Sequence, residues 1–92
     1  MADELTWRND EWTLEQGIIS QDIEIVVTVD SFCGAETVEL YLAEVIFAER
    51  GKPERRERAK GWLTRALTDW VSDNQGLLYQ AWIDRERAPR AA

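Results

Sequence analysis

Carboxylates are the side chains in this sequence whose number and spacing could do chemistry. Eighteen of the 92 residues are Asp or Glu, whereas histidine is absent and cysteine occurs once. Neighbouring acids such as Asp10 and Glu11, or Glu36 and Glu39, could serve as a general acid and base. Because acids are so abundant here, such a pair carries almost no information, and we do not expect an enzyme.

The residue types that are missing exclude several functional classes. Without histidine the chain lacks the commonest general base and the usual zinc ligand. Cys33 has no second cysteine for an internal disulfide and no histidine for a protease dyad. The serines and threonines also lack a histidine base, and the glycines form no phosphate-cradling pattern. The sequence therefore predicts no catalytic residues, no cofactor and no metal ion.

Charge is divided unevenly along the chain. Residues 1–49 carry twelve acids against one base, Arg8, a net charge of −11, whereas residues 50–92 carry ten bases and six acids, a net charge of +4. The second half opens with a run of bases: Arg50, Lys52, Arg55, Arg56, Arg58, Lys60 and Arg65. Such asymmetry indicates electrostatic partners, although the two halves of one domain can also face each other.

An acidic surface is the leading candidate for a binding site. Asp22 and Glu24 are two residues apart in an alternating segment, which spaces them by about 6.6 Å on one face of a strand, and Glu39 is expected on the same surface. A basic partner could bind this face in place of nucleic acid. The alternative is a solvated face that maintains solubility.

The run of bases suggests the opposite interpretation, a phosphate-binding patch. We expect these bases to pair with nearby carboxylates, since they border the buried stripe of the expected helix instead of forming one outward ridge. The net charge of −7 repels phosphate. Direct binding of nucleic acid is therefore not expected.

The five tryptophans fall into two groups. Trp62, Trp70 and Trp82 lie at helical spacing among apolar residues and are expected in the core. Trp7 and Trp12 lie in a short acidic stretch, where an exposed tryptophan would suit a protein interface; the alternative is that both cap the end of the core. The candidate partner-binding residues are therefore Trp7, Asp10, Glu11, Trp12, Asp22, Glu24 and Glu39.

Strands are expected in the first half. Residues 22–29 alternate aliphatic and mostly polar side chains, the pattern of a half-buried strand, and one or two strands are expected before them. Residues 31–35 resemble a hairpin loop with Gly34 free to adopt a positive φ. In residues 37–49 the alternation favours a strand, while the Ala, Leu and Glu content leaves a helix open.

Helices are expected in the second half. From Pro53, the apolar residues recur at helical spacing: Ala59, Trp62, Leu63, Ala66, Leu67, Trp70 and Val71. This predicts a helix over 54–72, a break near 72–76 and a second helix over 76–87, which the short connection would place antiparallel to the first. We expect both helices to pack on the aliphatic side of the 22–29 strand, with Trp62 among the buried residues.

These elements predict a single α+β domain over 1–92. It comprises an acidic β-rich half (1–49) with an antiparallel meander of about three strands, a helical half (50–88) with two antiparallel helices packed on one face, and a frayed tail (89–92). No apolar stretch approaches the roughly 20 residues of a membrane span, and the N-terminus lacks a signal pattern. A cytoplasmic location without membrane contact is expected.

The function expected from these features is a non-enzymatic, acidic protein-binding module that occupies a basic surface of a partner. In size, acidity and lack of catalytic groups, the chain is similar in type to the small inhibitors of phages and mobile elements, such as anti-CRISPR and anti-restriction proteins. That likeness implies blockage of a nucleic-acid-binding surface. The alternative is a structural subunit or a homo-oligomeric scaffold module, for example a homodimer, in which the acidic sheet of one copy meets the basic helix of another.

Overall fold

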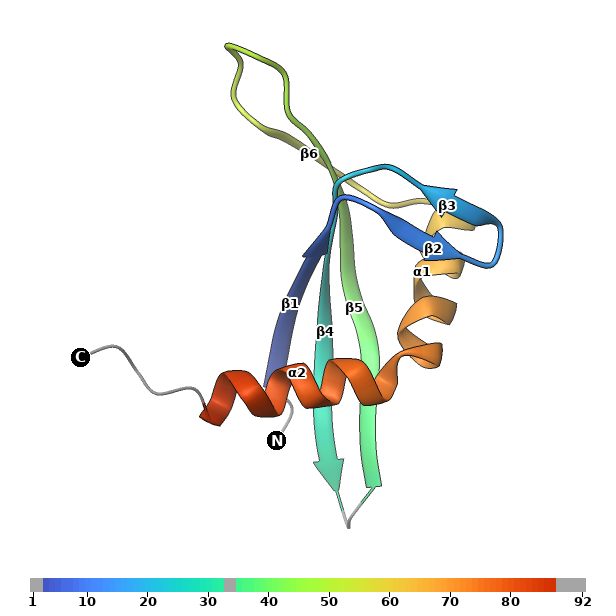
Figure 1. Cartoon of the computed structure of the whole chain (residues 1–92), viewed down its shortest axis with the longest axis vertical. Coiled ribbons are helices and arrows are strands. Elements are labelled where there is room, and N and C mark those ends of the chain that lie inside the picture. Colours follow the sequence, from blue (N-terminus) through green and yellow to red (C-terminus); the bar gives the residue numbers. More distant parts are fainter. Residues whose placement is uncertain (1–2, 33–34, 88–92) are drawn as a thin grey trace, which may run out of the picture.

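The computed structural model describes residues 3–32 and 35–87 and contains an antiparallel sheet followed by two C-terminal helices (Figure 1). In spatial order, the sheet consists of β1 (Asp3–Asn9), β4 (Ile23–Phe32), β5 (Ala35–Phe47) and β6 (Arg55–Arg58). A separate hairpin pairs β2 (Trp12–Leu14) with β3 (Gly17–Ile19), and the helices are α1 (Trp62–Asp73) and α2 (Gln75–Arg87). The predicted α+β class is confirmed, with four strands in the main sheet instead of about three.

β4 forms the centre of the sheet, as its alternating pattern predicts. Its aliphatic residues Ile23, Ile25, Val27 and Val29 are buried, and β1 and β5 pair with it on either side. The ambiguous segment 37–49 is a strand over most of its length, because pairing with β4 outweighs the helix propensity of its Ala, Leu and Glu residues. Cys33 and Gly34 lie outside the described residues.

A β-bulge changes which side chains of β5 face the core. Val27 pairs with Leu40 but Val26 pairs with Leu42, so Tyr41 is an extra residue in β5. After the bulge, Leu42 lies opposite Val26 on the other face of the sheet. The core-packed residues of β5 therefore change from even to odd numbers: Val38, Leu40, Ala43 and Val45.

The first predicted helix begins later than expected. Residues 55–58, assigned by their sequence to a helix over 54–72, form β6, which pairs with β5 and is exposed along its whole length. A strand that buries neither face needs no alternation, so its four charged residues gave no strand signal. α1 begins after Gly61, whose φ of 59° is a conformation that favours glycine. The prediction is therefore wrong for 54–61, and the second half is not helical from residue 50.

The two helices cover one face of the sheet. Ala66, Leu67 and Val71 of α1 and Leu78 of α2 join the core, and α2 agrees closely with the predicted second helix. Figure 1 shows α2 running across the strands and α1 beside the β2–β3 hairpin. The two helices therefore meet at an angle where α1 ends, and they are not the antiparallel pair that the sequence predicted. Neither described helix has the length and apolar character that crossing a membrane requires.

Two of the five tryptophans, Trp12 and Trp62, lie in environments that differ from the expected ones. Trp12 is only 1% exposed; its ring packs edge-on against Trp70 with centroids 4.8 Å apart, and its Nε1 donates to the Asn9 carbonyl at 2.9 Å. Trp62, predicted in the core, is 55% exposed. It is the first residue of α1, one turn before the buried Ala66 and Leu67, so the helix has not yet entered the core there.

Candidate binding face

The sheet has a second face that contributes nothing to the main core, and we call it the open face. The strand register arranges its residues in cross-strand rows: Arg8, Glu24, Glu44 and Arg58; Thr6, Val26 and Leu42; Glu4, Thr28 and Glu39; Asp30 and Thr37. Val26 and Leu42 are half-buried but pack outside the main core cluster. α2, which crosses in front of the strands in Figure 1, and α1 both pack on the opposite side.

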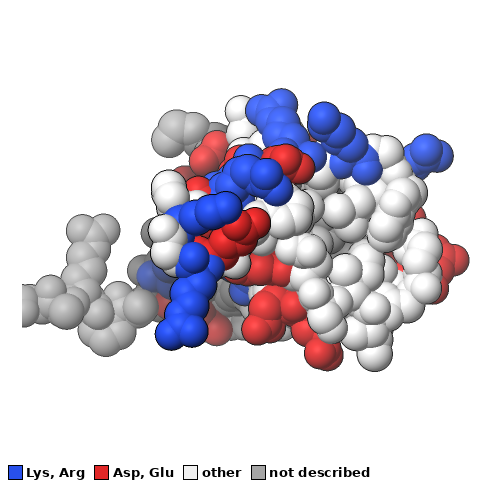
Figure 2. Space-filling model, turned by 90° about the horizontal axis from the view of Figure 1, so that it is seen from above, with Lys and Arg blue, Asp and Glu red and all other residues white. Residues whose placement is uncertain are grey.

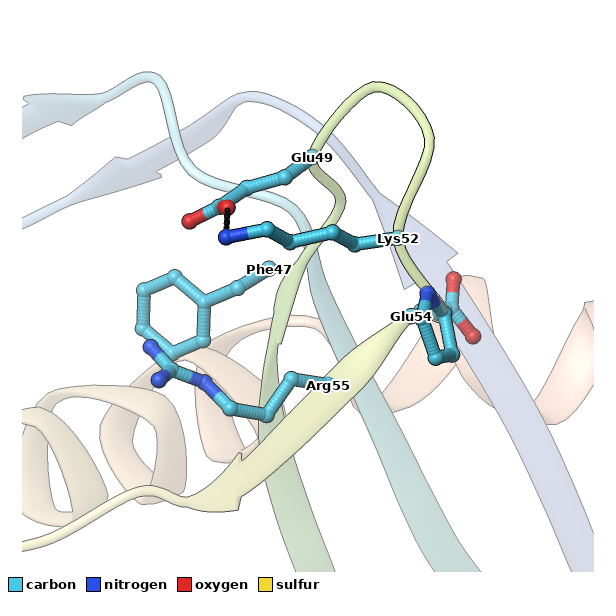
Figure 3. A pocket seen from close by; sticks show the side chains of 6 residues that line it. Phe47, Glu49, Lys52, Glu54 and Arg55 are labelled. Carbon is cyan, nitrogen blue, oxygen red and sulfur yellow. Dashed lines mark ion pairs between the residues drawn. The ribbon is translucent and has the colours of Figure 1, made fainter.

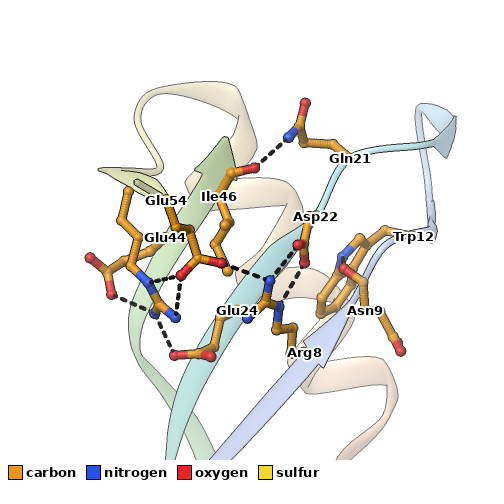
Figure 4. Close-up of polar contacts among 10 residues, drawn as sticks. Arg8, Asn9, Trp12, Gln21, Asp22, Glu24, Glu44, Ile46 and Glu54 are labelled. Atoms are coloured by element: carbon orange, nitrogen blue, oxygen red, sulfur yellow. Dashed lines mark hydrogen bonds and ion pairs between the residues drawn. The ribbon is translucent and has the colours of Figure 1, made fainter. Parts of the chain in front are cut away.

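Arg8 neutralises the first predicted acid at one end of this face. Its Nε and Nη2 donate to the two carboxylate oxygens of Asp22 at 2.9 and 2.6 Å, and Nη2 also lies 3.1 Å from Glu54 (Figure 4). The hydrogen bonds from Arg8 hold the pKa of Asp22 below its usual value, while the carboxylates raise the pKa of the guanidinium. Asp22 is therefore engaged with the protein itself.

Arg56 neutralises the second predicted acid. Its guanidinium lies 2.8 Å from Glu24, 3.7 Å from Glu44 and 3.5 Å from Glu54, and the hydrogen bond to Glu24 raises the pKa of Arg56. Glu54 joins the two arginines, since it lies 3.1 Å from Arg8 and 3.5 Å from Arg56, and Figure 4 shows Ile46 beside it. Ile46 is only 2% exposed although it lies outside the main core cluster. The charged network thus covers an apolar residue at this end of the sheet.

The opposite end of the open face retains acids without cationic partners. Glu4 and Glu39 are exposed, Asp30 is half-buried, and none of the three forms an ion pair within the described residues. Glu4 and Glu39 both lie opposite Thr28 in one row, and Asp30 lies in the next row. Of the three acids predicted on the sheet, Glu39 is therefore the one whose carboxylate forms no ion pair with the described residues.

The other predicted binding residues lie elsewhere. Asp10 and Glu11 are exposed in the turn between β1 and β2, away from the rows of the open face. Trp7 is partly buried and packs against the core. Trp12 is buried, so its assignment to a partner-binding surface is wrong: its ring is needed to close the core against Trp70.

Sequence reasoning missed part of this face. Glu4, Thr6, Asp30 and the apolar pair Val26 and Leu42 belong to it. The alternation in β4 could have placed Val26 and Asp30 on this face, because both occupy even-numbered positions. The face on which Leu42 lies could not be predicted in this way, because it depends on the bulge. These residues give the face an apolar centre between an acidic end and a charge-balanced end.

The loop between β5 and β6 contains a hollow of about 420 Å³. Figure 3 shows its charged lining: Lys52 Nζ lies 3.1 Å from Glu49, and the Arg55 guanidinium lies over the Phe47 ring, 4.7 Å from its centroid. Both cations are thus engaged within the loop. The expectation that bases of the run pair internally is confirmed for Lys52 and Arg55 as well as for Arg56.

The remaining bases of the run are available to solvent. Arg50, Arg58, Lys60 and Arg65 are exposed and form no ion pair with the described residues. Viewed from above the β5–β6 loop, basic side chains gather along one margin, with acidic ones between and below them (Figure 2). Positive and negative groups are therefore interleaved at this end.

Neither a cluster of metal-binding side chains among the described residues nor similarity to a known protein assigns a chemical activity to this chain. Across residues 3–32 and 35–87, no three side chains of His, Cys, Asp or Glu come together as ligands for a metal ion. Comparison with family models, curated proteins and solved structures gave no match to this chain.

Proposed function

We propose that the protein is a non-enzymatic binding module that docks its open face on a basic surface of a partner protein. The observation that carries this proposal is a sheet face with a half-buried apolar centre, Val26 and Leu42, next to the unpaired carboxylates of Glu4, Asp30 and Glu39. Apolar residues inside a polar rim are the usual arrangement of a protein interface.

The two parts of the face would play different roles. Covering the remaining exposed area of Val26 and Leu42 would contribute about 25 cal/mol per Å² of apolar surface. The unpaired acids would increase the association rate and orient a cationic partner. Asp22 and Glu24 would contribute less, because Arg8 and Arg56 already neutralise them.

The action that follows is occupation of the partner's surface. A protein surface that binds nucleic acid is basic, so it would complement the acidic end of the open face. An inhibitor of such a protein needs no catalytic group, only an interface that excludes the nucleic acid. The unpaired carboxylates support this form of the proposal through their charge.

Two matched charge reversals test the proposal. We expect Glu4→Lys with Glu39→Lys to slow association with partners captured from the source cell and to reduce its salt dependence. The control is Asp69→Lys with Asp73→Lys, the same charge change on exposed positions of α1. Association rates of both variants with the captured partner would be measured from low to moderate salt.

Two results would contradict the proposal. One is an equal effect of both double variants, which would mean that only net charge matters. The other is tight binding of DNA or RNA by the isolated protein in a gel shift, lost when Arg55, Arg56 and Arg58 are replaced by alanine. That result would make the basic run the functional site.

A further inference from the structure

β5 is much longer than the strand that covers its outer edge. β6 pairs only with residues 44–47, although β5 extends from Ala35 to Phe47. Among the described residues, no strand pairs with the outer side of β5 between Thr37 and Ala43. A sheet edge of this kind exposes main-chain donors and acceptors that can pair with another strand.

Two hydrogen bonds identify the residues that point outward along this edge. The Val38 carbonyl accepts from Gln75 Nε2 at 3.3 Å, and the Ala43 carbonyl accepts from the Ala59 N–H at 2.9 Å. Because main-chain direction alternates along a strand, the N–H and C=O of Leu40 point to the same side as the Val38 carbonyl. No hydrogen bond within the described residues reaches Leu40 from that side.

A groove runs along this edge between β5 and α1. Two adjoining hollows of about 220 and 380 Å³ share Leu40 and Thr68 in their lining. The α1 side is formed by Thr64, Thr68 and Ser72, which are four residues apart and therefore lie on one stripe of the helix. These small side chains leave space beside the free edge of β5.

We propose that this groove binds an extended peptide segment of a partner protein, which adds to β5 as an antiparallel strand alongside α1. An extended chain is the ligand whose alternating N–H and C=O groups match the unpaired edge at Leu40. The groove borders the open face at Glu39 and Arg58, but the edge of β5 at Leu40 and the α1 side of the groove lie outside that face. This inference therefore does not rest on the function proposed above.

The ends of the groove limit the ligand to a short single chain. The Ala43–Ala59 hydrogen bond closes one end and Gln75 closes the other, which leaves room for about five residues at 3.3 Å each. α1 flanks the edge along its length, so a strand that carries a neighbouring strand or helix would collide with it. This favours a peptide segment over a folded second copy.

Unpaired charges indicate the polarity of the peptide. Arg58 lines the groove near Ala43 and Glu39 lines it near Val38, and neither forms an ion pair with the described residues. An added strand antiparallel to β5 begins near Arg58 and ends near Glu39. The matching segment therefore has acidic residues at its start, basic residues at its end, and small or β-branched residues between them.

The test uses three capped hexapeptides and the full-length protein. The first has the order Glu-Glu-Val-Thr-Lys-Lys, the second has the acidic and basic ends exchanged, and the third is the first with N-methyl groups on Val and Thr. Binding is followed by amide chemical shifts. We expect the first peptide to shift Leu40 and its neighbours on β5 and α1, and the other two to bind about tenfold more weakly or less.

Two variants locate the site and its polarity. Thr68→Tyr fills the groove from an exposed helix position and should abolish the Leu40 shift, whereas Thr13→Tyr, at the exposed position of β2, should not change it. Exchanging the charges with Glu39→Lys and Arg58→Glu should reverse the preference between the first two peptides. Circular dichroism would verify that each variant is folded.

The outcomes are decisive for this site alone. Equal binding of the N-methylated peptide, shifts confined to Thr6 and Val26, or no Leu40 shift at about 5 mM peptide would each overturn the proposal. These results concern peptide binding by the unaltered protein, so they are distinct from the association rates that test the open face, although Glu39 borders both sites.

Discussion

Individual arginines determine how much of the acidic character of this protein is available to a partner. Arg8 binds both oxygens of Asp22, and Arg56 binds Glu24, so one carboxylate just before the central strand and one on it are engaged within the molecule. These arginines lie far from their partners in the sequence. A surplus of acids in the sequence therefore overstates the negative surface that another protein would meet.

The Arg8–Asp22 pair should give stability a dependence on acid pH. Its hydrogen bonds lower the pKa of Asp22 from an ordinary value of 3.8, so the pair stabilises the fold fully above that pH and is lost as pH falls through the lower folded value. We expect Asp22→Asn to lower the free energy of unfolding at pH 7, and the deficit to shrink below pH 3.8.

Urea unfolding across this pH range measures the deficit. Glu11→Gln is the control, since Glu11 is exposed and forms no ion pair with the described residues; it should leave the free energy of unfolding nearly unchanged. A deficit for Asp22→Asn that persists unchanged at low pH would show that the pair does not stabilise the fold as an ion pair.

Trp12 should be far more important for stability than its polar sequence neighbours indicate. It is almost completely buried and packs on Trp70, so we expect Trp12→Ala to lower the free energy of unfolding by about 3–5 kcal/mol. Trp62→Ala is the matched control at an exposed position and should cost well under that. Comparable losses in thermal melts of the two variants would contradict this assignment of the core.

At the scale of elements, the bulge in β5 yields a prediction about deletions. Removing Tyr41 should leave Leu40 facing the core and Leu42 facing out, because the extra residue is the one that is lost. Removing Glu39 should shift Leu40 out of the core and place Tyr41 there, opposite Val27.

We therefore expect the Tyr41 deletion to melt within a few degrees of the unaltered protein and the Glu39 deletion to be much less stable. Differential scanning calorimetry compares them, with amide spectra to verify pairing between β4 and β5. Equal destabilisation by the two deletions would indicate that the bulge does not set the two faces of β5.

Elements that bury one face could be predicted from the sequence, and elements that bury none could not. β4 and the buried stripe of α1 carry periodic apolar residues because packing demands them. β6 is held to β5 by main-chain pairing and by ion pairs of Arg56, so its sequence had no periodic constraint to reveal. The start of α1 was missed because Ala59 fits the helical spacing although it precedes the helix.

The candidate site was predictable to a similar extent. The outward side of β4 was correctly identified from alternation, which placed Glu24 on the open face. Its neutralisation by Arg56 requires β6 to fold back against the sheet, a contact 32 residues away in the sequence. The groove beside α1 depends on where β6 stops, which no local pattern specifies.

For the whole molecule, separated charges allow a test of self-association. Within the described residues, no ion pair engages Glu4 and Glu39 on the open face, Arg58 at its margin, or Lys60 and Arg65 elsewhere. If copies associate through these groups, a dimer should weaken as salt rises from about 50 to 500 mM, because screening shortens the range of charge interactions.

Sedimentation at several protein concentrations measures this directly. Glu4→Lys with Glu39→Lys should remove such a dimer. A monomer at all concentrations would eliminate the homo-oligomeric alternative and leave binding of a different protein. A dimer that does not respond to salt would indicate an apolar contact instead.

The uneven lengths of strand pairing in this sheet bear on how the chain folds. β4 and β5 are adjacent in sequence and pair over ten positions, whereas β1 reaches β4 only after the intervening β2–β3 hairpin, and β6 adds four positions at the end. Closing the shortest loop costs the least chain entropy, so the β4–β5 hairpin is expected to nucleate folding. In stopped-flow experiments, Val27→Ala should mainly slow refolding, and Arg56→Ala should mainly accelerate unfolding.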